Sequence, residues 1–548
     1  MGNEAIGQGL IEAGCQVATA YPGTPSTEIL QAVIDRRQGA VEPLHIEWSV
    51  NEKIAFEVAL AASYTGKRAA AVMKQVGLNV AADPFMRTAY LGVKGGLVTI
   101  VADDPGPHSS QNEQDTRLFC MQARVPVLDP ANPAEAKQMV AAAFELSEKY
   151  EVMTVLRPTT RICHSRQNVE LGEPVRLERS AAFEKDPTRW AATPAFLPAL
   201  HRKLNNTLEQ IAAEDTLQPG LANGDGSYPR QALVASGIVY GHLVDLLEDL
   251  ELHGRTDLFQ VLMPYPLNPQ FAEQLRTDYD RVLILEETYP VIELLLAHPG
   301  ASGKQSGAVP KEGELTPDVI HQVLADFLAL QQPAEAPAER RGQRPSLCPG
   351  CPHRAAFYSI KKCFPQGIFP SDIGCYTLGF LPPLSAMDTC VCMGASIGNA
   401  TGISKVISEE EQRKVVAVIG DSTFLHTGVN GLMDMVYNHS PSTVIILDNS
   451  TTGMTGRQDN PSTGYTLSGE KAYQVDLEAL CRSLGVQHVR TVDPYQMDET
   501  REVIKEEMAR PETSVVITRR PCVLIKHDVL EKKPPLFVDA DKCAACKD

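Results

Sequence analysis

The sequence predicts an α/β protein with mostly parallel sheets, arranged as three domains. The clearest indication is residues 415–449, in which VVAVIG and TVIILDN are two short β-branched runs separated by a segment of helical length. The same alternation recurs in NEAIGQGLIEAGCQVATAYPG near the start and in QALVASGIVYGHLVDLL further along. With 548 residues, 43% of them hydrophobic, the chain is long enough for three domains of ordinary size.

Composition narrows the classes of function. The net charge of −18 argues against nucleic acid and against an anionic membrane surface as partners. The longest apolar runs are shorter than the roughly 18–20 residues needed to span a bilayer, and no basic stretch typical of a secretory signal follows Met1. Thirteen cysteines, several in close pairs, indicate metal binding in a reducing compartment. We therefore expect a cytoplasmic protein.

The first domain, residues 1–164, contains three polar positions at predicted strand ends or helix starts. Thr24 lies in the YPGTPS turn, Glu52 opens an Ala-rich helix, and Arg117 lies in a polar loop after the strand GLVTIVA. An arginine can clamp a carboxylate with two hydrogen bonds. Each position also has an ordinary interpretation: a Pro-Gly turn, a helix-dipole partner and an exposed loop arginine.

The remaining chain divides by composition. Residues 165–228 are mixed in charge and poor in periodicity, so we expect an irregular excursion or linker. A second α/β domain is predicted for 229–332, followed by a linker rich in Pro, Ala and charge at 333–345. The third α/β domain covers 346–527, and residues 528–548 form a tail.

The third domain brings two oxygen-bearing side chains to one predicted sheet edge. Asp421 follows the strand VVAVIG, and Asn449 ends the strand TVIILDN. Open α/β sheets bind ligands at the carboxyl ends of their strands. A carboxylate and an amide oxygen suit Mg²⁺, whose remaining positions a phosphorylated ligand would fill. The alternative is an ordinary βαβ unit with a capping aspartate.

Four cysteines of the third domain are candidate ligands. Cys348 and Cys351 have the spacing that places two thiolates on one metal or cluster, and Cys375 and Cys522 follow later in the domain. A redox pair of the thioredoxin type is the alternative for the first two, but no thioredoxin-like domain surrounds them.

Two other cysteine pairs are interpreted differently. Cys390 and Cys392 flank a single residue and are expected in the core. Cys543 and Cys546 belong to VDADKCAACKD, which matches the beginning of a bacterial-ferredoxin run. We therefore expect residues 528–548 to start a ferredoxin-like domain that is truncated at Asp548.

The Gly420-Asp421-Ser422 turn with Asn449 resembles the diphosphate-binding motif of thiamine diphosphate (TPP) enzymes, Gly-Asp-Gly followed by Asn, with Ser422 replacing the second glycine. The resemblance implies that Asp421, the Asn449 side chain and the Thr451 carbonyl ligate Mg²⁺. It implies the following coenzyme contacts: Glu52, Met393, Gly394, Gly420, Asp421, Ser422, Asn449, Thr451, Gly453 and Met454.

The first two domains also resemble modules of TPP enzymes. Glu52, its Ala-rich helix, Gly66, the strand AAAVMK and Gly77 occur in the order found in the pyrimidine-binding domain. The resemblance implies that Glu52 hydrogen-bonds the aminopyrimidine ring and activates the coenzyme; Glu47 and Glu57 are the alternatives. Residues 229–332 resemble the transketolase C-terminal domain, which packs and dimerises in that superfamily.

Taken along its length, the chain is similar to the large subunit of the indolepyruvate type in the 2-oxoacid–ferredoxin oxidoreductase superfamily. The motifs GNEAI, YPGTPS, NEKIAFEVA, MKQVGLNVAADP, ADDPGPHSSQNEQDTR, LCPGCPHR and GDSTFLHTG occur in the family's order. This resemblance implies substrate contacts from Thr24, Arg117 and Met454. It also implies a 4Fe–4S cluster on Cys348, Cys351, Cys375 and Cys522, and a second cluster on Cys543 and Cys546.

The implied reaction is oxidative decarboxylation of an aryl 2-oxoacid to an arylacetyl-CoA, with coenzyme A as co-substrate and ferredoxin or another acceptor taking the electrons. The resemblance further implies a small (beta) subunit and a dimer of heterodimers. Three alternatives remain: a non-redox TPP-dependent decarboxylase or lyase, a different 2-oxoacid oxidoreductase subunit, and a non-catalytic scaffold with a vestigial site.

Overall fold

The computed structural model describes residues 1–548 except 42, 215–216, 224–229, 253–255, 332–345 and 526–548. The chain divides into two compact units, Met1–Arg340 and Arg341–Asp548, and each is described by itself. The predicted linker at 333–345 and the predicted ferredoxin-like tail, with Cys543 and Cys546, lie outside the described residues. In the described part of the chain, no helix is both long and apolar enough to cross a membrane.

The first sheet of unit 1 has six parallel strands in the order β2-β1-β3-β4-β6-β5. Strands β3 and β4 are buried along their whole length, as expected for central strands covered on both faces. The elements are α1 (Gly2–Glu12), β1 (Val17–Ala20), α2 (Thr27–Arg36), β2 (His45–Trp48), α3 (Glu52–Tyr64), β3 (Ala69–Lys74), α4 (Gln75–Val80), α5 (Ala82–Leu91), β4 (Leu97–Ala102), α6 (Thr116–Ala123), β5 (Val127–Leu128), α7 (Pro133–Tyr150), β6 (Thr154–Leu156) and α8 (Thr160–His164).

Residues 165–228 contain a helix that the sequence analysis does not predict. Helix α10 (Leu197–Ala212) follows the short α9 (Pro187–Trp190), so the segment is not irregular throughout, and its assignment as an excursion or linker stays a prediction. Leu204 and Leu208 lie in the same buried cluster as Phe85 of α5 and the strands of the first sheet. This helix packs onto the first sheet's helical layer, because its leucines repeat on one face.

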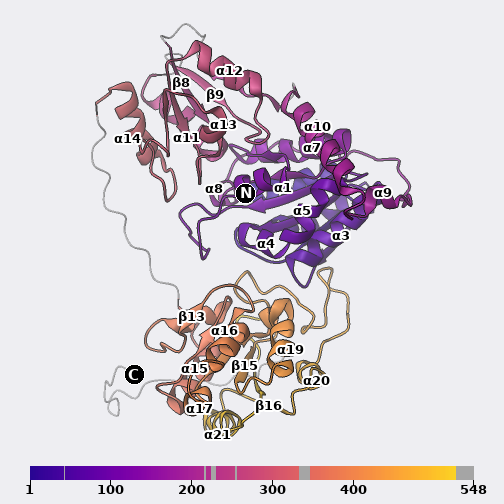
Figure 1. The fold of residues 1–548 in the computed structure, drawn as a ribbon, viewed down its shortest axis with the longest axis vertical. Helices are drawn as coiled ribbons and strands as arrows, with labels where there is room; N and C mark the ends of the chain where they lie inside the picture. Colours follow the sequence, from indigo (N-terminus) through magenta and orange to yellow (C-terminus); the bar gives the residue numbers. More distant parts are fainter. Residues whose placement is uncertain (42, 215–216, 224–229, 253–255, 332–345, 526–548) are drawn as a thin grey trace. The chain divides into compact units, whose positions relative to one another are not determined.

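The second sheet of unit 1 has the order β11-β10-β8-β9-β7, and only the edge strand β7 pairs in the antiparallel direction. Its helices are marked in Figure 1. The elements are β7 (Gly220–Asn223), β8 (Gln231–Ala235), α11 (Gly237–Asp249), β9 (Asp257–Gln260), α12 (Pro269–Asp278), β10 (Arg281–Leu285), α13 (Val291–Leu296), β11 (Ala301–Ser302) and α14 (Pro317–Leu328).

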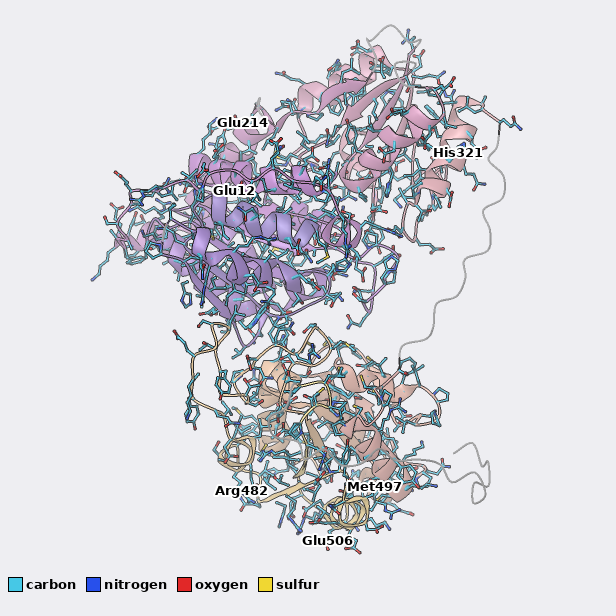
Figure 2. The ribbon with its side chains drawn as sticks, turned by 180° about the vertical axis from the view of Figure 1, so that it is seen from behind. Glu12, Glu214, His321, Arg482, Met497 and Glu506 are labelled. Carbon is cyan, nitrogen blue, oxygen red and sulfur yellow. The ribbon has the colours of Figure 1, made fainter. Side chains whose placement is uncertain are left out.

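Ion pairs hold helices and sheets of unit 1 together. At the surface, Glu12 of α1, labelled in Figure 2, pairs with Lys137 of α7. In the interior, Arg117 of the first sheet's domain contacts Glu286 at the end of β10, 2.8 Å away, and both side chains are almost completely buried. A buried arginine of this kind joins the two sheets through paired charges.

Unit 2 is built on a parallel four-stranded sheet with the order β14-β15-β17-β16, beside a two-stranded parallel pair β12-β13. Figure 2 labels Arg482 of α20 and Met497 and Glu506 of α21. The elements are α15 (Pro352–Cys363), β12 (Pro370–Ser371), the 3₁₀ helix η3 (Cys375–Phe380), β13 (Thr389–Cys390), α16 (Ala395–Ser404), α17 (Glu409–Gln412), β14 (Val416–Gly420), α18 (Asp421–Thr423), the π-helical η4 (Phe424–Gly428), α19 (Val429–Tyr437), β15 (Thr443–Asp448), α20 (Leu477–Ser483), β16 (His488–Val492), α21 (Met497–Met508) and β17 (Ser514–Arg519).

The prediction of an α/β protein with mostly parallel sheets is confirmed, and the β-branched runs that predict it form β14 and β15. Both strands are buried at every position because the apolar clusters of unit 2 lie on both faces of the sheet. The predicted domain boundaries stay predictions.

Candidate active site

Asp421 lies at the carboxyl end of β14, directly after Gly420. Its side chain is buried, and Oδ2 has no hydrogen-bond partner among the described residues. Burial, together with the charge of Asp448, raises the pKa of Asp421 well above its ordinary value, although the backbone N–H groups of Ser422 and Thr451 oppose the shift. A buried carboxylate that lacks a partner for one oxygen fits a cation site.

Asn449 lies at the same sheet edge as Asp421, because Gly420 and Leu447 are register partners in the parallel β14–β15 pair and the chain leaves the sheet just after each of them. The Asn449 side chain is buried and its Oδ1 accepts a hydrogen bond from the N–H of Thr451 at 3.2 Å. The structure therefore brings the predicted Mg²⁺ ligands Asp421, Asn449 and Thr451 to one sheet edge. Their chemistry fits a hard cation, since Mg²⁺ takes few protein oxygens and keeps positions for phosphate.

The predicted coenzyme contacts before and after Asp421 lie close together. Gly394 precedes α16 with a φ of +85°, and a Cβ there would lie 2.3 Å from Thr427 Oγ1. Thr427 Oγ1 donates to the carbonyl of Met393 at 2.8 Å. Because Thr427 belongs to the helical segment that follows Asp421, the Met393–Gly394 turn packs against that segment. Ser422, the substitute for glycine, shares a hydrogen bond with Thr452 Oγ1 at 2.9 Å.

The four predicted cluster cysteines lie near this edge. The backbone N–H of Cys522 donates to the carbonyl of Asn449 at 2.9 Å. A Cβ on Gly453 would lie 3.1 Å from Cys375 Sγ and 3.3 Å from Asn449 Nδ2. Burial raises the pKa of Cys375 to about 12, and the charges of Cys351, Cys522 and Cys348 add to the shift. The thiols are therefore within electrostatic range of one another.

In the described ranges, no group of three or more His, Cys, Asp or Glu side chains has the geometry to hold a metal ion. The expectation that Cys390 and Cys392 belong to the core is wrong, because both are exposed. Strand β13 has only two residues and a single neighbouring strand, so its side chains are not covered. Met454, predicted to contact substrate, is also exposed, at 47%.

Glu52 is the first residue of α3, whose start is fixed by the Asn51 side chain accepting the N–H of Ile54 at 3.0 Å. Glu52 is buried and lies against α4, since a Cβ on Gly77 would lie 2.6 Å from Glu52 Oε1. The alternatives are more accessible: Glu57 pairs with Lys53 at the surface, and Glu47 accepts hydrogen bonds from Ser49 and His45. Burial distinguishes Glu52 from them.

Thr24 and Arg117, both predicted to contact substrate, have different surroundings. Thr24 is half-buried, and its carbonyl accepts a hydrogen bond from Ser109 Oγ at 3.3 Å. Arg117 is fully buried, and Asp115 and Glu286 each contact its guanidinium at 2.8 Å. Those carboxylates raise the pKa of Arg117. Two buried carboxylates therefore occupy the guanidinium in this structure, and the substrate role of Arg117 stays a prediction.

Two residues that sequence reasoning missed stand at these edges. Lys74 ends β3 beside Gly23, and its Nζ donates to the carbonyl of Ser109 at 2.7 Å. Burial lowers the pKa of Lys74 to about 8. His353 of α15 is buried, with Nε2 3.2 Å from Asn449 Nδ2. The sequence contains a signal for each residue: Lys74 ends an otherwise apolar strand, and His353 follows the Cys348–Cys351 motif.

Two segments of the chain match known protein families. Residues 372–518 match the family described as thiamine pyrophosphate enzyme, C-terminal TPP binding domain. Residues 8–211 match the family described as pyruvate flavodoxin/ferredoxin oxidoreductase, thiamine diphosphate-binding. The candidate diphosphate edge and the Glu52 edge fall within these two matches.

Relatives that are similar along the whole of this chain agree with these two family matches. The indolepyruvate oxidoreductase subunit IorA of Pyrococcus horikoshii is 40% identical, covering 100% of this chain and 89% of its own. That of Thermococcus kodakarensis is 40% identical, covering 100% and 90%. That of Methanothermobacter thermautotrophicus is 38% identical, covering 100% and 90%. Similarity of this extent, together with a family match in each of the two units, means that the chain belongs to the indolepyruvate oxidoreductase subunit IorA family of thiamine diphosphate-dependent 2-oxoacid oxidoreductases.

Proposed function

We propose that this chain is the TPP-binding subunit of an enzyme that oxidatively decarboxylates an aryl 2-oxoacid of the indolepyruvate type to an arylacetyl-CoA. Coenzyme A would take the acyl group, and an iron–sulfur cluster held by the chain's cysteines would pass the electrons to ferredoxin or another acceptor. The observation that carries the proposal is the carboxyl edge of the unit 2 sheet, where Oδ2 of Asp421 has no partner among the described residues and Cys375 and Cys522 lie near Asn449. The names of the relatives support the substrate class.

The diphosphate end of the coenzyme would be held through Mg²⁺ by Asp421, the Asn449 amide oxygen and the Thr451 carbonyl. Met393, Gly394, Gly420, Ser422 and Gly453 would line the phosphates or thiazolium. The small residues let the backbone come close, and Gly420 has no room for a side chain, because a Cβ would lie 2.6 Å from the Tyr376 ring. When bound, TPP would supply the carbon nucleophile and would accept the electron pair that departing carbon dioxide leaves on the substrate carbon.

Glu52 would supply the proton chemistry that activates the coenzyme. Its carboxylate would hydrogen-bond the aminopyrimidine ring nitrogen and hold a proton there. The burial of Glu52 supports this role, because a carboxylate shielded from water exchanges its proton with the bound coenzyme and not with solvent. Cys348, Cys351, Cys375 and Cys522 would hold the proximal 4Fe–4S cluster, and Cys543 and Cys546, outside the described residues, would contribute to a second cluster.

The substrate contacts combine predicted and observed residues. Thr24 would bind the keto or carboxylate oxygen, and Met454 would contact the aryl group, since an exposed, flexible thioether side chain adapts to apolar surfaces. For the carboxylate we propose Lys74 in place of Arg117. Lys74 Nζ and Thr24 are linked through Ser109, whose carbonyl and hydroxyl contact them respectively.

The organisation follows the same reasoning. We propose a pyrimidine-binding domain at 1–164, a transketolase C-terminal-like domain at 229–332 and a diphosphate-binding domain at 346–527. The relatives are named as subunits, which supports a small partner subunit and a heteromeric assembly of the dimer-of-heterodimers kind. A cytoplasmic location agrees with the cysteine content.

The test is a measurement of TPP, Mg²⁺, iron and zinc on the complex of this chain with its small subunit, purified without oxygen. Carbon dioxide release and ferredoxin reduction from indolepyruvate are measured on the same preparation, with and without coenzyme A. TPP and iron with ferredoxin reduction support the proposal. Carbon dioxide release without iron supports the non-redox lyase, and absence of TPP supports the scaffold.

A further inference from the structure

His353 lies between the cysteine motif and the candidate metal site of unit 2. It is the second residue of α15, two positions after Cys351, and is 3% exposed. Its ring stands edge-on to Tyr376, with ring centroids 6.4 Å apart and planes at 89°. Tyr376 in turn packs against Gly420, the residue before Asp421. The imidazole is therefore held by the same side chain that packs under the Asp421 turn.

The hydrogen bonds of Asn449 determine which way its amide faces. Oδ1 accepts the N–H of Thr451 at 3.2 Å, which only an oxygen can do. Nδ2 then faces His353 Nε2 at 3.2 Å. Since an amide nitrogen donates only, the imidazole nitrogen must accept, and the ring proton of neutral His353 belongs on Nδ1. Both partners of the amide agree on one orientation.

We propose that His353 is a positioning residue for the metal–diphosphate site: it accepts a hydrogen bond from Asn449 Nδ2 and so keeps the Asn449 oxygen directed at Mg²⁺. This inference rests on the proposed TPP–Mg²⁺ function of the same edge. A flipped amide would present N–H groups, which cannot ligate a cation, to the metal. Loss of a residue that hydrogen-bonds a metal ligand and orients it typically lowers the metal affinity by about 10–100-fold.

The position of His353 in the sequence gives this role a further consequence. Residues 348–353, Cys-Pro-Gly-Cys-Pro-His, contain two proposed cluster ligands and the acceptor that orients a proposed metal ligand. Gly453 lies close to both sites, because a Cβ there would lie 3.1 Å from Cys375 Sγ and 3.3 Å from Asn449 Nδ2. The short motif thus links the orientation of Asn449 to the conformation of the cysteine loop.

The test measures how much Mg²⁺ is needed for TPP binding, by calorimetry on the complete anaerobic complex. His353→Leu removes the acceptor at similar volume, and we expect the half-saturating Mg²⁺ concentration to rise about 10–100-fold. Saturating Mg²⁺ should restore most of the TPP affinity. His353→Gln places an acceptor oxygen near the position of Nε2, so it should return Mg²⁺ dependence to within a few-fold of wild type.

The control is Ser359→Ala, which changes another buried side chain of α15 and should leave the Mg²⁺ dependence unchanged. If His353→Leu lowers the melting temperature or the number of binding sites without changing half-saturation, the residue only packs and the proposal is wrong. Equal behaviour of the Leu and Gln variants would also overturn it. Wild-type protein that binds no TPP with Mg²⁺ would instead refute the proposed function itself.

Discussion

At the scale of single residues, the most informative side chain is a carboxylate that the protein buries without a partner for one oxygen. Burial and the charge of Asp448 raise the pKa of Asp421, so folding disfavours its ionised form, and a bound cation would offset this cost. Asp421→Asn removes this charge at constant shape. We expect TPP and Mg²⁺ affinity to fall together by about 100-fold or more in calorimetry, because the remaining ligands are neutral.

The stability of the coenzyme-free protein provides the matched readout. A group whose pKa is raised on folding loses stabilising effect as the pH rises, so ionised Asp421 destabilises the empty protein at neutral pH. Asp421→Asn should therefore unfold no more easily than wild type in a thermal scan without Mg²⁺. Unchanged TPP affinity in Mg²⁺ buffer would show that Asp421 is not a ligand.

For Glu52→Gln we expect the opposite division: TPP stays bound while turnover is lost. The amide keeps the shape of Glu52 but cannot accept and return a proton, whereas the diphosphate contacts lie on other residues. Carbon dioxide release from indolepyruvate and calorimetric TPP affinity measure the two effects. Glu57→Gln is the control, because that residue pairs with Lys53 at the surface. Wild-type rates in the Glu52 variant contradict the assignment.

Lys74 gives a pH-dependent prediction. Its pKa of about 8 means that the ammonium loses its proton as the pH rises through that value, and with it the attraction for a carboxylate. The KM for the 2-oxoacid should rise above about pH 8. Lys74→Met should raise KM about 10–100-fold at pH 7 and remove this dependence, as expected for loss of a charge-assisted hydrogen bond.

The control for Lys74 is Lys149→Met, which alters an exposed lysine paired with Glu214. It should change neither KM nor its pH profile. A Lys74→Met enzyme with wild-type KM at pH 7 would mean that the lysine only supports the Ser109 loop.

At the scale of elements, the loop that begins α15 connects the sheet edge to the proposed cluster. Cys351 is the residue that caps α15, and its N–H donates to the carbonyl of Cys348 at 3.1 Å. Cys351→Ala should remove the iron of one 4Fe–4S cluster and abolish ferredoxin reduction, while TPP binding survives. Iron analysis and calorimetry test this, with Cys392→Ala, an exposed thiol, as control. Zinc in place of iron would contradict the cluster assignment.

Elements also show what the sequence could predict. The runs that form β14 and β15 are recognisable because fully buried parallel strands need unbroken β-branched residues. Helix α10 was missed although Leu200, Leu204 and Leu208 repeat at helical spacing, because the surrounding residues resemble a linker in composition. The residue types of Cys390 and Cys392 predict a place in the core. Burial depends on neighbouring elements, however, and the two-residue strand β13 has few of them.

The candidate site follows the same division. Asp421, Asn449 and the four described cysteines could be predicted, because the motif residues occupy strand ends or loops that parallel topology brings to one edge. The sequence marks His353 and Lys74 only as polar residues at unusual positions, because their roles depend on single contacts across the fold. The ion pair of Arg117 could not be predicted for a related reason: Glu286, its partner, is distant in the sequence.

At the scale of the whole molecule, unit 1 depends on that ion pair. Arg117→Met leaves Asp115 and Glu286 as buried charges without their partner, and we expect a loss of about 3–5 kcal/mol in the free energy of unfolding. Denaturant unfolding measures this loss. Arg87→Met, at an exposed arginine paired with Asp83, should change it by less than about 1 kcal/mol. A raised KM at unchanged stability would restore the substrate role of Arg117.

The same pair sets a limit on how this protein can be divided. Glu286 accepts the N–H groups of Val291, Ile292 and Glu293 as well as the arginine, so the contact is built into the start of α13. A fragment that ends after the first sheet would carry Arg117 without its partner from the second. The two sheets should therefore be expressed and recombined as a single segment. Chimeric proteins should tolerate a crossover after α14 far better than a crossover between the two sheets.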